Sequence, residues 1–289
     1  MAIVIRDIRT FDELRAVEQL QKEVWGFDDL DVVSSAHLIA VQKNSGVLIG
    51  AFDGPVLVGF VYGFLGLEHG RLTMHSHMLA VKRDYRSHNI GYLLKLAQRE
   101  HSLKLGIRWI TWTYDPLQAL NAHFNIVKLG VYADRYEVNF YGEETSSFLH
   151  QGIGTDRLWV TWPIASQRVV ARIEGTSDAS SLSAEEIAQV PALVVSSAES
   201  DSPAIGDRDA VEHSAAVLIE IPADINQLKQ HDPQAARAWR EATRRAFLDA
   251  LGRGFVVEHF VRLKEAERVR CFYRLRRLEP AETPWLRGE

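Results

Sequence analysis

A strand, a polar turn and the start of a helix follow one another in residues 77–97, which read HMLAVKRDYRSHNIGYLLKLA. The apolar run predicts a strand that ends at Val81, and apolar residues at helical spacing from Ile90 predict an amphipathic helix. The turn between them points several backbone N–H groups at one place, and the helix dipole adds positive potential there. This junction predicts an anion site that suits a pyrophosphate.

Two residues in the turn have the backbone properties that close approach of a phosphate requires. Gly91 has no side-chain bulk, and Asn89 tolerates a positive φ angle better than most residues do. Arg86 adds a cation near the mouth of the turn. The alternative interpretation is that residues 82–91 form an ordinary loop between a strand and a helix.

The elements that position this turn are predicted from apolar periodicity and from turn residues. A helix begins at Thr10, because Glu13 completes a capping-box pattern. Asp53-Gly54-Pro55 and His69-Gly70 are typical of tight turns that separate three consecutive strands. Strands are expected at residues 3–8, 46–52, 56–67, 71–81, 107–113, 131–141 and 158–164, and further helices at 34–43, 89–106 and 117–129.

The composition changes after this part of the chain. Residues 166–212 are rich in serine, alanine and acidic residues, which is typical of a connecting segment with short ordered pieces. Residues 213–289 predict a smaller α/β unit with a strand, a helix and two closing strands. Its helix begins at Asp232-Pro233, where a capping residue precedes a proline at the first helical position. The expected domains are therefore residues 1–165 and 213–289, joined by the connecting segment.

Composition and charge exclude several classes of protein. The 289 residues carry 33 Lys+Arg and 38 Asp+Glu, a formal net charge of −5, which argues against broad binding of nucleic acid or anionic membranes. The single cysteine, Cys271, excludes an intramolecular disulfide and argues against a zinc-thiolate cluster. The longest apolar run, residues 56–67, is far shorter than the roughly 20 residues of a membrane-spanning helix. We expect a cytoplasmic α/β protein without a metal.

Residues 81–91 resemble the signature of the GNAT superfamily of N-acyltransferases. That signature is Val, four residues, Arg or Gln, two residues, Gly, one residue, and Gly or Ala. Val81, Arg86 and Gly91 occupy three of its positions, and Asn89 replaces the first Gly. The order of elements over residues 1–165 also resembles the superfamily. The resemblance implies a mixed, mostly antiparallel central sheet with helices on both faces, to which the C-terminal α/β unit is added.

The resemblance also implies a co-substrate, acetyl-CoA or another acyl-CoA, bound where the fourth and fifth strands separate. The fourth strand would offer backbone groups to the pantetheine arm, and the amides of the turn would bind the pyrophosphate. The family often has an asparagine after the fifth strand near the coenzyme. The residues implied to contact the coenzyme are Leu79, Ala80, Val81, Arg86, Ser87, His88, Asn89, Ile90, Gly91, Tyr92 and Asn121.

The implied chemistry is direct attack of an amine on the thioester, which requires a group that accepts a proton. His75 and His77 alternate with Leu79 and Val81 along one strand, and period two predicts that all four side chains share a face. The pKa of histidine suits a base. Either histidine could equally be a packed residue without a catalytic role. His123 is a third candidate base.

A proton donor for the leaving thiolate is less well defined. The family often has a tyrosine four residues before the glycine of the last helix, and here Ile126 stands four residues before Gly130. Tyr136 is taken as the candidate acid, and Tyr132 and Tyr114 remain alternatives. Asp115, after the fifth strand, either holds substrate or orients the base, or it caps the following helix.

The expected reaction is transfer of an acetyl or succinyl group to the primary amine of an amino-acid-like small molecule. Arg157 could clamp the carboxylate of such a substrate, although a hairpin turn with a surface ion pair is an alternative. Exposed strand edges are compatible with a homodimer. A rival hypothesis is a non-catalytic acyl-CoA sensor or interaction module. A helix of the C-terminal unit has a basic face made of Arg237, Arg240, Arg244 and Arg245. Three roles remain open for this face: contact with the phosphates of the coenzyme, binding of an acidic partner, or exposure to solvent.

Overall fold

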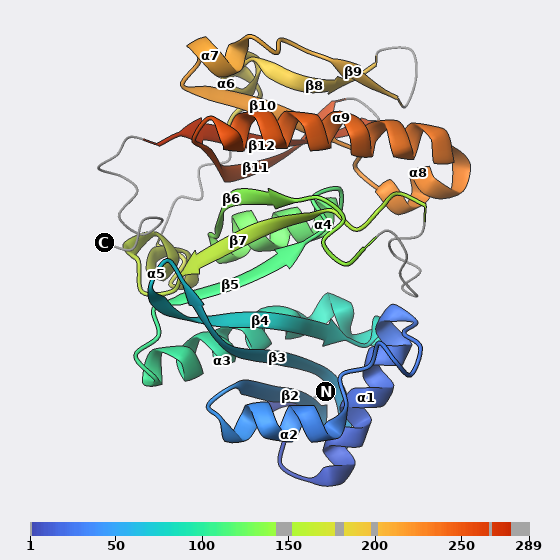
Figure 1. The fold of residues 1–289 in the computed structure, drawn as a ribbon, viewed down its shortest axis with the longest axis vertical. Coiled ribbons are helices and arrows are strands. Elements are labelled where there is room, and N and C mark those ends of the chain that lie inside the picture. Colours follow the sequence, from blue (N-terminus) through green and yellow to red (C-terminus); the bar gives the residue numbers. More distant parts are fainter. Residues whose placement is uncertain (1, 143–151, 177–181, 198–201, 266–267, 279–289) are drawn as a thin grey trace. The chain divides into compact units, whose positions relative to one another are not determined.

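A computed structural model describes residues 2–142, 152–176, 182–197, 202–265 and 268–278 (Figure 1). The chain forms two compact units, one of residues 1–112 with 145–151 and the other of residues 113–144 with 152–289. The expected domains 1–165 and 213–289 follow a different division and stay a prediction. Both units combine helices with a mixed, mostly antiparallel sheet, as the sequence predicts.

The first unit contains a sheet in the order β1-β2-β3-β4-β5. The pairs from β1 to β4 are antiparallel, and β4 pairs with β5 in parallel. The predicted three-strand meander is thereby confirmed. The elements are β1 (Ile3–Asp7), α1 (Phe11–Trp25), α2 (Ser35–Lys43), β2 (Val47–Asp53), β3 (Val56–Glu68), β4 (Arg71–Val81), the 3-10 helix η1 (Arg83–His88), α3 (Ile90–Lys104) and β5 (Trp109–Tyr114), whose last two residues belong to the second unit.

Local sequence signals explain the helix that opens this unit. The Thr10 hydroxyl accepts a hydrogen bond from the Glu13 N–H (3.2 Å), and the Glu13 carboxylate accepts one from the Thr10 N–H (3.2 Å). These reciprocal bonds are the predicted capping box. The helix ends at Gly26, whose φ of 70° is in the left-handed region that favours glycine.

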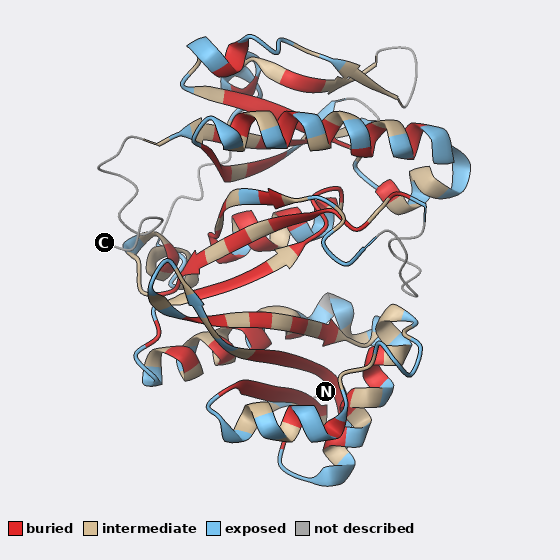
Figure 2. Ribbon diagram, viewed as in Figure 1, coloured by how far each residue is buried: buried red, intermediate tan, exposed pale blue. Residues whose placement is uncertain are grey.

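The sheet of the first unit is covered on both faces. Every residue from Val47 to Phe52 is buried, so β2 has no solvent-facing side over that length (Figure 2). α1 and α2 pack on one face, where Leu14, Val17 and Leu38 join Phe60 in one apolar cluster. α3 packs against β2, β3 and β4 on the other face (Figure 1). Helices on both faces of the sheet agree with the predicted fold class.

The second unit contains a sheet in the order β7-β6-β11-β12-β10-β8-β9. β8 and β10 are parallel, and the other pairs described here are antiparallel. Its elements are α4 (Ala119–Ala122), the π-helix η2 (His123–Leu129), β6 (Tyr132–Glu137), β7 (Arg157–Pro163), α5 (Gln167–Ile173), α6 (Ala184–Ala188), β8 (Ala192–Ser196), β9 (Pro203–Ile205), α7 (Ala210–His213), β10 (Ala216–Ile221), α8 (Ile225–His231), α9 (Pro233–Gly252), β11 (Phe255–Glu265) and β12 (Arg268–Arg277).

Two differences from the predicted elements matter for function. The helix expected at residues 117–129 is α4 followed by η2, whose π-helical turns contain more residues per turn than an α-helix. The connecting segment contributes two strands, and β8 pairs with β10 inside the sheet. α9 begins as predicted, because the Asp232 carboxylate accepts bonds from the Gln234 and Ala235 N–H groups (3.1 and 2.9 Å).

Lys95 lies in the core of the first unit, on the face of α3 that meets the sheet. It is 2% exposed. Its ammonium donates to the Ser76 hydroxyl (2.8 Å) and the Gln98 amide oxygen (3.0 Å) and lies 3.5 Å from the centre of the Trp112 ring. Burial lowers the pKa of Lys95 well below its usual range, because the apolar surroundings disfavour the charged form.

Lys95→Met tests this burial through the pH dependence of stability. The unfolded chain holds its lysine proton up to about pH 10.4, whereas folded Lys95 loses it at lower pH. The folding penalty of Lys95 is therefore largest at low pH and disappears as pH rises toward that value. Urea unfolding between pH 7 and 9 should show a smaller rise of stability with pH in Lys95→Met than in the exposed control Lys104→Met. Equal slopes would contradict a depressed pKa.

Candidate functional site

β4 has a strand partner on only one side over its last six residues. Among the described residues its pairing with β5 is confined to Met74 and His75. The Lys82 N–H donates to the Val58 carbonyl of β3 (2.8 Å). Because main-chain groups of successive residues point to opposite sides of a strand, those of Val81 and Leu79 face away from β3. This open edge has the N–H and C=O groups that an extended ligand arm needs.

A β-bulge lies in the middle of β4. Tyr62 of β3 is opposite Met78 and Gly63 is opposite Ser76, so His77 is an extra residue in β4. A side chain at Gly63 would have no room, since its Cβ would lie 2.8 Å from the His75 carbonyl oxygen. The bulge therefore depends on glycine in the neighbouring strand.

The bulge changes which side chains share a face. His75 and His77 lie together, with ring centres 6.3 Å apart, and both contact Phe64. Leu79 and Val81 instead face α3, where they are the nearest neighbours of Gly91. The predicted face shared by all four residues is therefore wrong for Leu79 and Val81, because the extra residue reverses the alternation.

The turn after β4 is the short helix η1 followed by a residue in the left-handed region. Asn89 has φ 56° and ψ 15°, which is the positive φ that the sequence predicts. Arg86 is exposed and its Nε donates to the Val81 carbonyl (3.2 Å), so the cation is held beside the end of β4. His88 and Asn89 are exposed as well. The side chain of Ser87 lies outside the described part of the chain.

The first turn of α3 leaves space beside Gly91. A Cβ there would lie 3.8 Å from Leu79 Cδ2 and 3.9 Å from Val81 Cγ2, which is ordinary contact. Packing within the first unit therefore does not require glycine at this position. Ile90 is buried and anchors the turn, while Tyr92 is half-buried. The helix N-terminus and the small residue together make a cradle that suits an anion.

His75 belongs to a short hydrogen-bonded chain that spans three strands. Its Nδ1 is 3.2 Å from the Thr111 hydroxyl, and that hydroxyl donates to the Glu68 carboxylate (2.9 Å). Since the one O–H of Thr111 donates to Glu68, the Thr111 oxygen accepts a hydrogen bond from the His75 Nδ1–H. The neutral ring then has its lone pair on Nε2, which is the form a base requires.

His77 is packed more deeply than a surface histidine. Its ring meets Tyr62 edge to face, with centres 5.9 Å apart. Burial lowers the pKa of His77, and the nearby His37 lowers it further. His77 is therefore neutral at pH 7 and able to accept a proton. The structure brings the two predicted base candidates together, on one face of β4.

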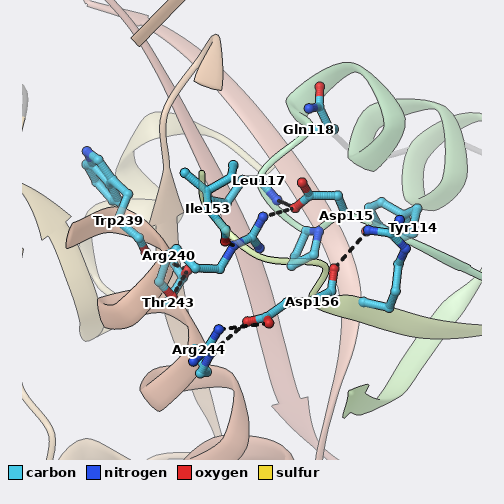
Figure 3. A network of polar contacts seen from close by, with 12 residues as sticks. Tyr114, Asp115, Leu117, Gln118, Ile153, Asp156, Trp239, Arg240, Thr243 and Arg244 are labelled. Atoms are coloured by element: carbon cyan, nitrogen blue, oxygen red, sulfur yellow. Dashed lines mark hydrogen bonds and ion pairs between the residues drawn. The ribbon is translucent and has the colours of Figure 1, made fainter. Parts of the chain in front are cut away.

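The second unit holds a buried network of charged side chains (Figure 3). Asp115 and Arg240 form an ion pair of 2.7 Å, with side chains 2% and 3% exposed. Asp115 also accepts a hydrogen bond from the Leu117 N–H (2.9 Å), so it closes the turn after Pro116 as one of its predicted roles requires. Arg240 Nε donates to the Ile153 carbonyl (3.0 Å).

A second carboxylate, Asp156, completes the network. It accepts hydrogen bonds from the Tyr136 hydroxyl (2.7 Å) and from Arg244 Nε and Nη2 (2.7 and 2.9 Å). Burial raises the pKa of Tyr136 far above its usual value, and the neighbouring Asp156 raises it further. Tyr136, a predicted catalytic residue, is therefore a protonated side chain within this network.

Arg157 is also inside the second unit. It is 7% exposed, its Nη1 donates to the Asp156 carbonyl (3.1 Å), and its guanidinium lies over the Tyr141 ring. The alternative of a surface ion pair is therefore wrong. Burial lowers the pKa of Arg157, while Asp115 opposes that shift. The predicted catalytic Asp115 and Tyr136 and the predicted substrate-binding Arg157 thus belong to one set of neighbouring residues.

The basic helix face in α9 has a different role from those expected. Arg240 and Arg244 are bound to Asp115 and Asp156 inside the second unit, and Arg237 donates to the Gly152 carbonyl (3.1 Å). Arg237 and Arg245 are exposed, Arg245 at 67% of its side chain. A solvated or free phosphate-binding face is therefore wrong for Arg240 and Arg244, because each is paired with a carboxylate of the second unit.

The other candidate residues, Asn121, Ile126 and Tyr114, belong to the second unit. Asn121 is exposed on α4, and Ile126 is fully buried in η2. The Tyr114 hydroxyl donates to the Tyr273 hydroxyl (3.2 Å), and Tyr273 donates to the Pro116 carbonyl (2.7 Å). In the part of the chain that is described, no three His, Cys, Asp or Glu side chains gather as a metal site would require. No helix there has the length and apolar character of a membrane span.

Several residues of these sites were not predicted. Thr111 and Glu68 belong to the hydrogen-bonded chain that begins at His75, and Lys95 donates a hydrogen bond to Ser76 next to the bulge. Asp156 follows Gly152 and Gly154 in the sequence, but its charged partner Arg244 is 88 residues away in α9. Such long-range pairs leave no local signal in one sequence.

Comparison with known proteins finds likeness in structure and none in sequence. No family model matches the chain, and no curated protein is similar to it in sequence. The solved ribosomal-protein-S18-alanine N-acetyltransferase of Escherichia coli is 15% identical, covers 57% of this chain and 96% of its own, and has a TM-score of 0.45. Aminoglycoside 6'-acetyltransferase type Ii is 19% identical, covers 58% and 99%, and has a TM-score of 0.45.

A third similar structure is described as a putative acetyltransferase of the GNAT family from Desulfovibrio desulfuricans. It is 13% identical to the chain, covers 57% of this chain and all of its own, and has a TM-score of 0.46. All three of these structures are described as acetyltransferases.

Arg240→Ala tests the buried network. Removing the guanidinium leaves Asp115 buried without its closest cation, and breaking such a pair costs about 3–5 kcal/mol. The free energy of unfolding, measured with urea, should fall by that amount. Arg245→Ala, on the same helix but exposed, should change it by less than about 0.5 kcal/mol. A loss below about 1 kcal/mol in Arg240→Ala would contradict a structural role for the pair.

Proposed function

We propose that the chain is an acyl-CoA-dependent N-acyltransferase of the GNAT type. The observation that carries this proposal is the junction of β4, η1 and α3. There the open edge of β4 leads into a left-handed Asn89 and the cradle at Gly91. Val81, Arg86 and Gly91 occupy three positions of the signature that the sequence resembles, and Asn89 replaces its first Gly. Arg86 beside the end of β4 adds the cation of that signature.

The residues present fit a coenzyme with a pyrophosphate and an extended arm. The main-chain groups of Leu79 and Val81 would hold the arm, and the N–H groups at the start of α3 would bind the pyrophosphate. Ala80, Ser87, His88, Ile90 and Tyr92 belong to the same stretch, and Asn121 is proposed as a further contact. The bound acyl-CoA supplies a thioester, which an amine can attack directly.

His75 and His77 are proposed to remove the proton from the attacking amine. Burial lowers the pKa of His77, and the hydrogen bonds of Thr111 with Glu68 orient His75. A base held by a second hydrogen-bonded group has a fixed ring orientation, which lowers the entropic cost of proton transfer. Tyr136, which remains protonated, is the proposed acid.

The proposed acceptor is a small amine that carries a carboxylate, as an amino acid does. Arg157 is the proposed carboxylate-binding group, and it lies in the positive surroundings of Arg240. The Nη1 of Arg240 has no hydrogen-bond partner among the described residues although it is buried. A buried guanidinium donor of this kind favours an anionic ligand. The acyl group is proposed to be acetyl or succinyl.

Calorimetric titration with acetyl-CoA, succinyl-CoA and free coenzyme A tests the coenzyme site. We expect micromolar binding, which is about −8 kcal/mol. Gly91→Glu should weaken binding at least tenfold, because its carboxylate fills the cradle and repels the pyrophosphate. The same charge favours a helix N-terminus, so thermal stability should not fall. Lys104→Gln, at the other end of α3, changes the net charge equally and should bind normally. Equal binding by both variants would overturn the site.

His75→Ala and His77→Ala test the base with an amino-acid panel and the acyl-CoA that binds best. Loss of a general base should lower kcat by about 10²–10⁴-fold with little change in KM for the coenzyme. In the wild type, kcat/KM should fall as the pH drops below the lowered pKa of His77, because the protonated ring cannot accept a proton. Full activity in both variants would show that neither histidine is the base.

A further inference from the structure

A pocket of about 360 Å³ lies within the second unit, between η2, α5 and β11. Its lining combines six apolar side chains with four basic ones, and no acidic residue lines it among the described part of the chain. The basic residues are His123, Arg172, His259 and Arg262. The coenzyme site and the network around Asp115 involve none of these four, so the pocket is a separate feature.

Irregular backbone on two sides makes room for this pocket. β11 pairs with β6 only at Val257 among the described residues, so its edge beyond that point has no strand beside it. Glu258 is an extra residue there, since Val257 and His259 are opposite successive residues of β12. The wall that faces this edge includes η2, a π-helix. π-Helical turns and bulges occur preferentially at functional sites.

The apolar part of the pocket is built on a packed base. Val261 belongs to an apolar cluster with Phe272, and Leu182 and Leu263 pack against that cluster. Packing in this cluster therefore fixes the positions of Val261, Leu182 and Leu263 in the pocket wall. A pocket of this volume, mostly apolar with a few convergent polar groups, is the usual form of a small-molecule site.

The charged part of the pocket is positive. No carboxylate lies within ion-pair distance of Arg172 or Arg262 in the described ranges. Arg172 uses its Nη1 to donate to the carbonyls of Ile126 (2.9 Å) and Val127, which fixes the guanidinium against η2. The nearby Glu258 carboxylate is already bound by Arg274 (2.6 Å) and Arg276 (3.1 Å).

The pKa values of His123 and His259 are lowered, mainly by burial and further by nearby cations. The pKa of His259 is lowered to about 4, first by burial, with Arg168, Arg274 and Arg172 adding to the shift against the opposing charge of Glu258. The pKa of His123 is lowered by burial and by Arg262 and Lys128. Burial disfavours a charge of either sign, so only the part of each shift that comes from the arginines and Lys128 reflects a positive potential.

We propose that this pocket binds a small organic carboxylate with an apolar body. The carboxylate would pair with Arg262 and Arg172, and neutral His123 and His259 would each offer a ring N–H as donor. The apolar body would lie against the side chains supported by the Val261 cluster. The site is independent of the proposed acyl transfer, and its test does not require activity.

Hexanoate and hexanamide are the probes, because they have nearly the same shape and differ in charge. Ligand-observed NMR titration of the full chain should give a dissociation constant at least tenfold lower for hexanoate than for hexanamide. Arg262→Gln should weaken hexanoate binding at least fivefold and leave hexanamide binding unchanged. Val127→Phe, which fills the pocket, should weaken both. Arg245→Gln, an exposed arginine on α9, is the matched control and should bind as the wild type does.

Three results would overturn the proposal. Equal binding of the two probes would mean that charge does not contribute. Unchanged hexanoate binding in both Arg262→Gln and Val127→Phe, with thermal midpoints that show intact folding, would place the bound hexanoate elsewhere, including at the coenzyme site. Absence of hexanoate binding up to millimolar concentration would mean that the pocket is not a carboxylate site. Titration of acetyl-CoA into Arg262→Gln separates this proposal from the coenzyme site, since that binding should be unaffected.

Discussion

The chemistry proposed for the first unit depends on the end of β4, which in the described part of the chain pairs with β5 only at Met74 and His75. A strand edge without a partner exposes N–H and C=O groups that must find water or a ligand. The same segment carries the bulge at His77, which turns the two histidines to one face while Leu79 and Val81 face α3. Glycine in β3 permits the bulge, and the left-handed Asn89 turns the chain into α3. One interruption of regular pairing thereby sets both the candidate base and the candidate anion cradle.

The second unit follows another constraint, the cost of burying charge. Ion pairs such as Asp115 with Arg240 seldom stabilise a fold more than well-packed apolar residues of the same size would. Their presence in a core therefore calls for another reason, such as positioning or ligand binding. Arg157 and Tyr136 share these surroundings. The pocket along β11 is a second part of this unit where several cationic side chains lie together, and there too packing alone gives no reason for them.

Local signals in the sequence were sufficient for much of the fold. The capping box at Thr10, the meander turns and the proline at the start of α9 all act within a few residues, so one sequence contains them. The positive φ of Asn89 followed from its side chain. The bulge at His77 was not predictable, because it depends on register with a glycine in the neighbouring strand. Arg240 and Arg244 were misread for a related reason, since their partner carboxylates lie 125 and 88 residues away.

The chain departs from the family pattern at two positions, and the two replacements have different consequences for the proposed site. Asn89 adopts the left-handed conformation that the first glycine of the signature would provide, so this replacement preserves backbone geometry. Ile126 is different, because it is fully buried in η2 and no hydroxyl stands there. A leaving thiol ionises near pH 8.5 in water and needs far less help from an acid than an alcohol would. In the proposed acyl transfer, the absence of that tyrosine therefore affects the step that depends least on a proton donor, whereas removal of a proton from the attacking amine still requires a base. For the proposed acyl transfer, that asymmetry makes the two histidines of β4 the residues whose substitution tests catalysis against a sensory role.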